Sequence, residues 1–207
     1  MQLGFYFDQT RCNGCFTCIV ACKDWNDVDA GPSSWRRVLT IEKGSYPDLF
    51  VTFLSTSCYH CIKPVCVSVC PVNAINKRKT DGVVLVNREL CLGKDNCQLC
   101  LEACPYHVPQ FGIEPNAKMQ KCHFCIDRLS QGKKPACVDA CPMYALDVGP
   151  ISELRKKYGS TTQAEGFQFF KELFPSVIFK PRTDTSNYTN VKINVSPKYN
   201  ILQRPFS

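Results

Sequence analysis

Four runs of cysteine constrain this 207-residue chain more than any other feature, because together they hold all sixteen of its cysteines. Every run contains four cysteines and ends in Cys-x3-Cys, and the last three runs are followed directly by proline. The first run is Cys12, Cys15, Cys18 and Cys22; the second is Cys58, Cys61, Cys66 and Cys70; the third is Cys91, Cys97, Cys100 and Cys104; the fourth is Cys122, Cys125, Cys137 and Cys141. The hydrophobic fraction of 44% counts these cysteines, so the other apolar residues fall short of the roughly 45 to 50% of ordinary domains. A covalent or metallic link must therefore supply part of the cohesion.

Three kinds of cysteine chemistry compete: disulfides, structural zinc and iron-sulfur clusters. Disulfide frameworks are typical of short secreted chains, whereas this chain is long, shows no secretory signal at residues 1–8 and packs four cysteines into residues 12–22. Structural zinc prefers paired Cys-x2-Cys knuckles, often with histidine, and the three histidines do not fall at knuckle offsets. A bacterial ferredoxin run holds one cubane with three cysteines and sends its fourth, before proline, to a second cubane. The four runs fit this pattern and predict four 4Fe-4S clusters.

The second and third runs have the order of a complete ferredoxin. Residues 71–75 follow Cys70 as Pro-Val-Asn-Ala-Ile, and Asp81-Gly82 before the apolar residues 83–86 predicts a hairpin. This stretch resembles a two-cluster bacterial ferredoxin, so the second run pairs with the third and, by elimination, the first pairs with the fourth. The predicted fold class is α+β, with two nested ferredoxin-like units of short hairpins and short helices. The outer unit is residues 1–57 with 105–150, the inserted unit is residues 58–104, and residues 151–207 form an extended C-terminal docking tail.

The rule of three ligands plus one distant ligand predicts four ligand sets. Set A is Cys12, Cys15, Cys18 and Cys141; set B is Cys22, Cys122, Cys125 and Cys137; set C is Cys58, Cys61, Cys66 and Cys104; set D is Cys70, Cys91, Cys97 and Cys100. The third run departs from the pattern, because residues 92–96 widen its first gap to five. Its alternative is a solvated loop that leaves Cys91 unligated and the cluster in a 3Fe form.

The charge of the chain does not indicate a nucleic-acid partner. The formal net charge is +7, and residues 151–207 carry nine Lys or Arg against four Asp or Glu. Each cubane with four thiolates carries about −2, so four clusters bring the loaded protein to roughly neutral. The chain also has no concentrated basic block. The pair Arg36-Arg37 lacks a following apolar segment and is predicted to be solvated rather than a twin-arginine signal.

The residues between the runs are expected to be mainly structural. The expected core residues around the first run are Phe5, Phe7, Ile19, Leu39, Ile41, Phe50 and Phe53, with Trp25 and Trp35. His123 either donates an N–H to a sulfide or lies at the surface. In the tail, residues 151–158 predict a short helix that ends at Gly159. An apolar set follows that either covers its own domain or docks on a partner: Phe167, Phe169, Phe170, Leu173, Phe174, Val177, Ile178 and Phe179.

A family resemblance covers nearly the whole chain. It depends on residues 121–132, Lys-Cys-His-Phe-Cys-Ile-Asp-Arg-Leu-Ser-Gln-Gly, on residues 135–138 and 140–142, and on the order of the runs. These features resemble the four-cluster iron-sulfur subunit of the dimethyl sulfoxide reductase family, which also serves polysulfide, thiosulfate, nitrate, arsenate and formate enzymes. The widened third run and the compact length depart from some relatives.

The resemblance implies an electron-transfer subunit of anaerobic respiration without catalytic residues of its own. Its implied partners are a molybdenum or tungsten bis-pterin catalytic subunit and a quinone-linked membrane subunit or a soluble electron carrier. The residues agree, because every strong motif serves as cluster ligand and no catalytic triad or phosphate loop is visible.

Two other classes stay open at this stage: a free-standing polyferredoxin, and a catalytic or sensing protein with an open cluster at Cys91. The sequence leaves open the partner's substrate, the direction of electron flow and the compartment, which is cytoplasmic, or periplasmic by export with a signal-bearing partner.

Overall fold

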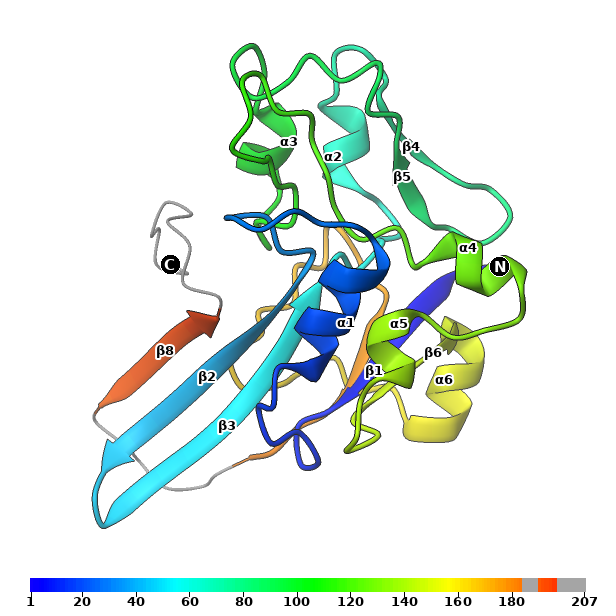
Figure 1. Ribbon diagram of the computed structural model, residues 1–207. Helices are drawn as coiled ribbons and strands as arrows, with labels where there is room; N and C mark the ends of the chain where they lie inside the picture. Colours follow the sequence, from blue (N-terminus) through cyan, green and yellow to red (C-terminus); the bar gives the residue numbers. More distant parts are fainter. Residues whose placement is uncertain (184–189, 197–207) are drawn as a thin grey trace.

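Short strands and short helices alternate along the chain, as the predicted α+β class requires (Figure 1). The computed structural model describes residues 1–183 and 190–196. Its elements are β1 (Leu3–Asp8), α1 (Thr17–Trp25), β2 (Arg36–Ser45), β3 (Asp48–Ser57), α2 (Val65–Ser68), β4 (Ile75–Lys77), β5 (Val84–Val86), α3 (Leu99–Ala103), α4 (Ile126–Ser130), α5 (Ala136–Asp139), β6 (Leu146–Pro150), α6 (Ile151–Tyr158), β7 (Val177–Lys180) and β8 (Val191–Ser196). Among the described helices, none has the length and hydropathy that crossing a bilayer requires.

A sheet of three strands, in the order β6-β1-β7, brings the two ends of the described chain together. β1 is buried along its whole length and pairs antiparallel with β6, with Phe7 opposite Leu146. On its other edge β1 pairs parallel with β7, with Phe5 opposite Val177. Strands buried on both faces are apolar throughout, and the sequence Leu-Gly-Phe-Tyr-Phe of β1 follows this rule.

The hairpin of β2 and β3 is the longest element pair, and the sequence analysis did not predict it. Its ten-residue strands pair antiparallel from Arg36 with Ser57 to Ser45 with Asp48. β8 adds a third strand along β2, with Ile41 opposite Ile193. Figure 1 shows the hairpin extending away from the rest of the molecule, with α1 in front of it. Because β3 ends at Ser57, it delivers the chain directly to the second cysteine run.

The inserted segment contains the hairpin that Asp81-Gly82 predicted. β4 and β5 pair antiparallel with Ile75 opposite Val86, and Gly82 adopts a φ of 72° that favours glycine. Helices α2 and α3 lie beside this hairpin at the top of Figure 1.

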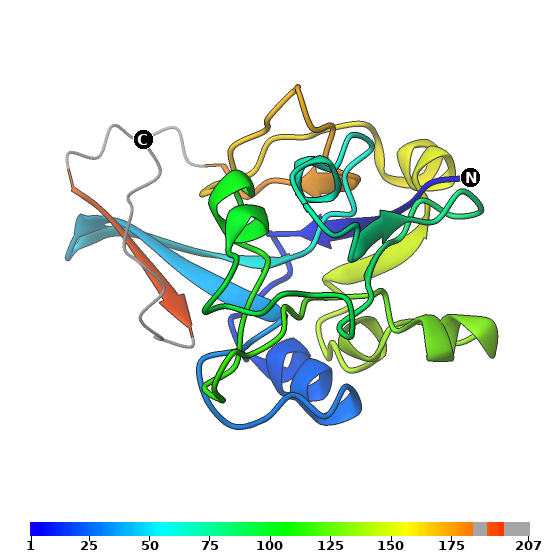
Figure 2. The same cartoon turned by 90° about the horizontal axis from the view of Figure 1, so that it is seen from above.

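The main core lies where the outer segments meet. Figure 2 shows β1 between the helices α1 and α5 on one side and the tail segment 160–180 on the other. Six of the expected core residues are buried and Phe53 is partly buried against the same core: Phe5, Phe7, Ile19, Leu39, Ile41 and Phe50. The expectation for Trp25 is wrong, because its side chain is 42% exposed under the guanidinium of Arg128.

The tail covers the body of the protein over much of its described length. α6 spans Ile151–Tyr158 and ends at Gly159, as predicted. The expectation that the whole apolar set of the tail is available for docking is wrong for Val177, Ile178 and Phe179. These three residues are 1 to 3% exposed because β7 adds to the β1 edge and buries both of its faces.

Candidate metal centres

All sixteen cysteines are free, so the disulfide alternative is wrong. The fold then decides which thiols lie near one another. Within the described residues, no three His, Cys, Asp or Glu side chains are close enough to share a single metal ion. A cubane does not need such convergence, because each of its thiolates binds a different iron atom.

The structure brings the cysteines of set A together from opposite ends of the outer segments. Cys12, Cys15 and Cys18 lie at the start of α1, and Cys141 follows α5. All four line one cavity with about 340 Å³ of empty space. Burial raises the pKa of Cys12 to about 11, and the neighbouring Cys18, Cys141 and Cys15 contribute to this rise.

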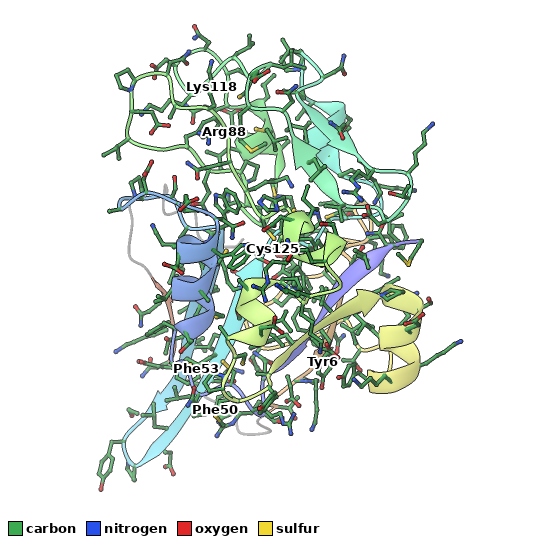
Figure 3. All side chains as sticks on the ribbon, turned by 45° about the vertical axis from the view of Figure 1, so that its right-hand side comes forward. Tyr6, Phe50, Phe53, Arg88, Lys118 and Cys125 are labelled. Carbon is green, nitrogen blue, oxygen red and sulfur yellow. The ribbon has the colours of Figure 1, made fainter. Side chains whose placement is uncertain are left out.

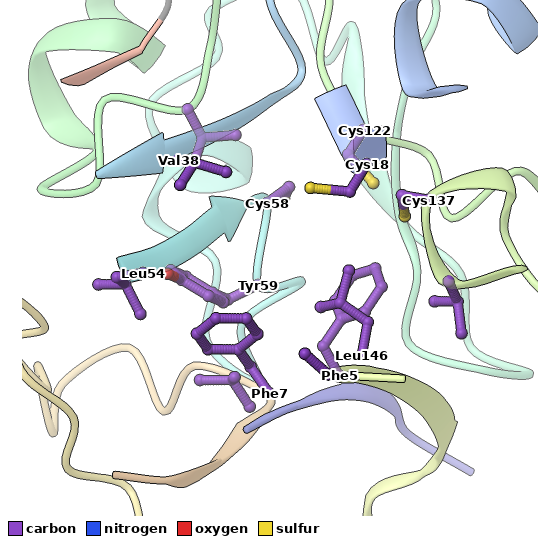
Figure 4. Close-up of a cluster of buried hydrophobic side chains, with 14 of the residues drawn as sticks. Phe5, Phe7, Cys18, Val38, Leu54, Cys58, Tyr59, Cys122, Cys137 and Leu146 are labelled. Carbon is purple, nitrogen blue, oxygen red and sulfur yellow. The ribbon is translucent and has the colours of Figure 1, made fainter. Parts of the chain in front are cut away.

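Set B is the most enclosed group, because all four of its cysteines are buried. Cys22 lies on α1 and Cys137 on α5, while Cys122 and Cys125 precede α4. Burial is the main cause that raises the pKa of Cys22, and Cys122, Cys137 and Cys125 add to it. Figure 4 shows Cys122 and Cys137 beside Cys18 in the core, and Figure 3 places Cys125 in the middle of the molecule.

Set C joins the end of the hairpin to the end of α3. Cys58 and Cys61 follow β3, Cys66 lies on α2, and Cys104 follows α3. Burial raises the pKa of Cys61, and Cys58, Cys104 and Cys66 raise it further. The structure therefore brings the distant Cys104 into the same group as the first three cysteines of the second run.

Set D includes the cysteine of the widened gap. Cys70, Cys91, Cys97 and Cys100 line a second cavity, with about 360 Å³ of empty space. Burial raises the pKa of Cys100 to about 12, and Cys91, Cys97 and Cys70 contribute in that order. Cys91 thus lies with the other three thiols and also accepts the backbone N–H of Met119 at 3.5 Å.

Electrostatic contacts also connect the sets to one another. In three places a thiolate of one set adds to burial in raising the pKa of a thiol in the next set. These pairs are Cys18 with Cys137, Cys122 with Cys58, and Cys66 with Cys100. The sets therefore follow one another in the order A, B, C, D.

Backbone N–H groups point at the sulfurs because the runs force a repeated left-handed turn. The third residue after the last cysteine has a positive φ in the second, third and fourth runs: Asn73, His107 and Tyr144. This turn directs the next N–H back, so Ala74 donates to Cys70 Sγ at 3.2 Å and Ala145 donates to Cys141 Sγ at 3.3 Å. Donors to a thiolate stabilise its charged form. The repeated Cys-Pro-x-x-Ala pattern is thus a sulfur-binding turn.

Several buried donors near the cysteines have no protein acceptor, which tests whether the sites fit an iron-sulfur group. Among the described side chains these are Arg36 Nε, Tyr59 OH and His60 Nε2. His60 accepts the N–H of Val84 at Nδ1, so its remaining nitrogen is the proton donor of the neutral ring. Buried donors normally have partners. Sulfide and thiolate acceptors of bound clusters supply them, so the residues present fit the group.

Two buried cations near the cysteines were not found from the sequence. The prediction that Arg36 is solvated is wrong, because it is 2% exposed and donates to Ser55 and Ser57 in the hairpin. Lys121 is buried beside Cys122 and donates to the carbonyl oxygens of Val84 and Cys122. A charged residue reads as solvated until long-range pairing buries it, so spacing gives no signal for either residue.

His123 fits neither of its two readings fully. Its ring is partly buried and meets Trp35 edge to face at 5.2 Å between centroids. Its Nδ1 accepts the backbone N–H of Ile126 at 3.4 Å. The expectation of a surface histidine is therefore wrong, and the ring packs beside set B.

Comparison with known proteins gives the same result as the site. A family model for a 4Fe-4S dicluster domain matches residues 49–151, which contain the second, third and fourth runs. The iron-sulfur subunit of the anaerobic dimethyl sulfoxide reductase of Escherichia coli (strain K12) is 41% identical over 192 residues, which cover 89% of this chain and 91% of the relative. A subunit of the sulfite dehydrogenase of Allochromatium vinosum is 37% identical over 172 residues, covering 73% of this chain and 70% of the relative. Protein NrfC of Escherichia coli (strain K12) is 40% identical over 155 residues, covering 74% and 67%.

Sixteen free thiols on a ferredoxin-like fold define an iron-sulfur electron-transfer subunit with four 4Fe-4S clusters. The likeness to the dimethyl sulfoxide reductase subunit extends over nearly the whole length of both chains. The chain belongs to the iron-sulfur subunit family of the dimethyl sulfoxide reductases.

Proposed function

We propose that the chain relays single electrons between a molybdenum or tungsten bis-pterin catalytic subunit and a quinone-linked membrane subunit or a soluble redox carrier. Each cluster, when bound, takes up one electron and gives it back. The proposed ligands are the sixteen cysteines in sets A to D, and the proposed units are residues 1–57 with 105–150 and the inserted residues 58–104. The observation that carries the proposal is the unbranched succession of the sets through three thiol pairs.

The exposure of the cysteines supports entry and exit at the two ends of this succession. Cys15 of set A is exposed, and three cysteines of set D are partly exposed: Cys70, Cys91 and Cys97. Set B is fully buried in the middle. A relay needs solvent-shielded inner sites and accessible terminal sites, because electrons exchange with partners only at the surface. The direction of flow is set by the partner's reaction and not by this chain.

Docking in this proposal uses the part of the tail that the body leaves uncovered. Phe174 is 43% exposed, and Lys63 lies 5.6 Å from its ring centroid. Its backbone is fixed to the body, because Ile62 donates to the carbonyl oxygen of Phe174 at 2.9 Å. A rigid, exposed aromatic residue is typical of an interface anchor. The proposed interface is therefore smaller than the full apolar set of the tail.

Two substitutions test the nested ligand sets. Cys141→Ser should damage the cluster of Cys12, Cys15 and Cys18, whereas Cys104→Ser should damage the cluster of Cys58, Cys61 and Cys66. Electron paramagnetic resonance of the reduced proteins identifies the altered cluster by comparison with Cys15→Ser and Cys61→Ser. If Cys141→Ser changed the same signal as Cys61→Ser, the nested arrangement would be wrong.

The relay itself is tested with the anaerobically purified chain and the catalytic subunit encoded beside it. Dimethyl sulfoxide is the first acceptor to try, because it is the substrate named for the 41% identical relative. The pre-reduced chain should be reoxidised only when both the catalytic subunit and its acceptor are present. A free-standing polyferredoxin would instead exchange electrons with unrelated carriers and would not co-purify with any pterin enzyme.

A further inference from the structure

Arg36 is a buried guanidinium that has no carboxylate partner among the described residues. Its side chain donates from Nη1 to Ser55 Oγ at 2.9 Å and from Nη2 to Ser57 Oγ at 3.0 Å. The guanidinium carbon lies 4.9 Å from the ring centroid of Phe5, and Nε has no protein acceptor. The first residue of β2 is therefore held rigidly by two serines of β3.

A buried charge without an opposite charge costs several kcal/mol, so something near Arg36 must balance it. Burial acts to lower the pKa of Arg36, but the negative charges of four nearby cysteines outweigh burial and raise it. These cysteines are Cys137, Cys18, Cys122 and Cys22, of which one belongs to set A and three belong to set B. The guanidinium keeps its charge at every working pH.

A hydrogen-bond chain connects the guanidinium directly to set A. Ser55 Oγ accepts a hydrogen bond from Arg36 and lies 3.5 Å from Cys18 Sγ. On the other side of the same guanidinium lie Cys22 and Cys137 of set B, from the two helices α1 and α5 that pack together. Arg36 thus occupies the junction between the first and second sets of the succession.

We propose that Arg36 is a positioning residue that holds a permanent positive charge between sets A and B and raises the reduction potentials of both clusters. The proposal rests on the ligand sets given under the proposed function. When either cluster receives one electron from its neighbour, the negative charge at that set increases by one. The nearby cation stabilises this reduced form, and Arg36 neither gains nor loses a proton. Because the same charge acts on both sets, their potentials stay close and electrons pass in either direction.

The neighbouring arginine supplies a matched control. Arg37 is partly buried and donates to the carbonyl oxygens of Tyr106 and His107 at 3.2 and 2.8 Å. Burial lowers its pKa, and the cysteine that acts against this is Cys104 of set C. A change at Arg37 should therefore affect set C and leave sets A and B nearly unchanged.

The test is a potentiometric titration of the anaerobically purified holoprotein, followed by electron paramagnetic resonance. In Arg36→Gln, the ratio of reduced to oxidised cluster at a fixed ambient potential should fall about tenfold for sets A and B, which is about 59 mV for a one-electron couple. Arg36→Lys should recover most of this ratio because it restores the charge. Arg37→Gln should shift set C instead, and Arg88→Gln, at an exposed position, should shift none.

Signals are assigned with Cys15→Ser for set A and Cys125→Ser for set B, which also separates this proposal from the ligand sets. If both cysteine variants altered one signal, the ligand sets would be wrong. If the assignments held but Arg36→Gln kept all four potentials, or shifted all four equally, the role of Arg36 would be wrong. If Arg36→Gln lost its clusters, Arg36→Lys decides: retained iron and near-normal potentials support the charge, and lost iron shows that only the shape of the guanidinium matters.

Discussion

Asp147 holds the tail helix to the central sheet through a single carboxylate. It lies on β6 and accepts hydrogen bonds from Tyr158 OH at 2.7 Å, Lys134 Nζ at 2.9 Å and Lys157 Nζ at 3.2 Å. Burial acts to raise the pKa of Asp147, but these donors and the N–H of Val148 outweigh burial and hold the pKa well below its usual range.

Asp147→Asn should lower the free energy of unfolding by about 1 to 3 kcal/mol, because it removes charge-assisted hydrogen bonds from a buried site. The two lysines are mostly exposed and contribute little of this. A depressed pKa stabilises the fold above the unfolded value near 4, and this contribution is lost as pH falls through the folded pKa. Denaturant unfolding at pH 7 and pH 3 measures both effects.

The control for this substitution is Asp139→Asn, whose carboxylate pairs with Arg128 at the surface of α5. Its side chain is 46% exposed, so the cost should be less than about 1 kcal/mol. Equal destabilisation by both substitutions would show that burial of Asp147 does not matter.

At the residue scale, the sequence revealed the cysteines but not the charges around them. Thiol ligands were predictable because cluster geometry fixes their spacing within a few residues. Arg36 is buried only because β2 pairs with β3 and places it against Ser55 and Ser57. Nothing within the local sequence around Arg36 carries that information.

Secondary structure elements differ in how far apart their determinants lie. The β4–β5 hairpin and α6 were predictable, because Asp81-Gly82 and Gly159 are local signals. The β2–β3 hairpin lacks such a signal, since residues 46–47 between its strands are Tyr-Pro. The parallel pairing of β1 with β7 joins segments some 170 residues apart and follows from no local pattern.

The buried position of β7 changes what truncation of the tail should do. Removing residues after Gly149 deletes α6 and β7, which uncovers the β1 edge and the packing of Tyr6 against Tyr158. Unpaired backbone groups and exposed apolar surface both cost stability. We expect this truncated chain to aggregate or to lose iron, which analytical ultracentrifugation and metal analysis would show.

Truncation after Arg182 is the matched control, because it keeps α6 and β7. It removes β8, whose Val191 and Ile193 are 54% and 44% exposed, so clusters should assemble normally. A chain ending at Gly149 that carried its full iron complement would show that β7 is dispensable for the ferredoxin-like core.

The clusters join segments of the whole molecule that hydrophobic packing alone would hold weakly. Each set combines thiols from two distant runs, and burial raises the pKa of several of them, as for Cys12 and Cys100. Iron binding must supply the free energy that keeps such thiols ionised. Loss of iron should therefore loosen the whole fold rather than one loop.

Sixteen iron atoms and sixteen acid-labile sulfides per chain are the expected content, because sixteen cysteines divide into four sets of four. The widened third run is where this count is most at risk. Cys91 lies with Cys97 and Cys70 around Cys100, and Lys118 Nζ donates to its carbonyl oxygen at 2.8 Å, which fixes the loop. We therefore expect Cys91 to be a ligand and the set D cluster to be of the 4Fe form.

Metal and sulfide analysis of the anaerobically purified chain, together with electron paramagnetic resonance of the oxidised protein, measures this. The native chain should show no 3Fe signal, and Cys91→Ser should lower the count to about fifteen iron atoms with a new 3Fe signal. Cys97→Ser is the matched comparison within the same set. About fifteen iron atoms and a 3Fe signal in the native chain would mean that Cys91 is not a ligand, and a content near twelve would mean that one of the four sets does not assemble.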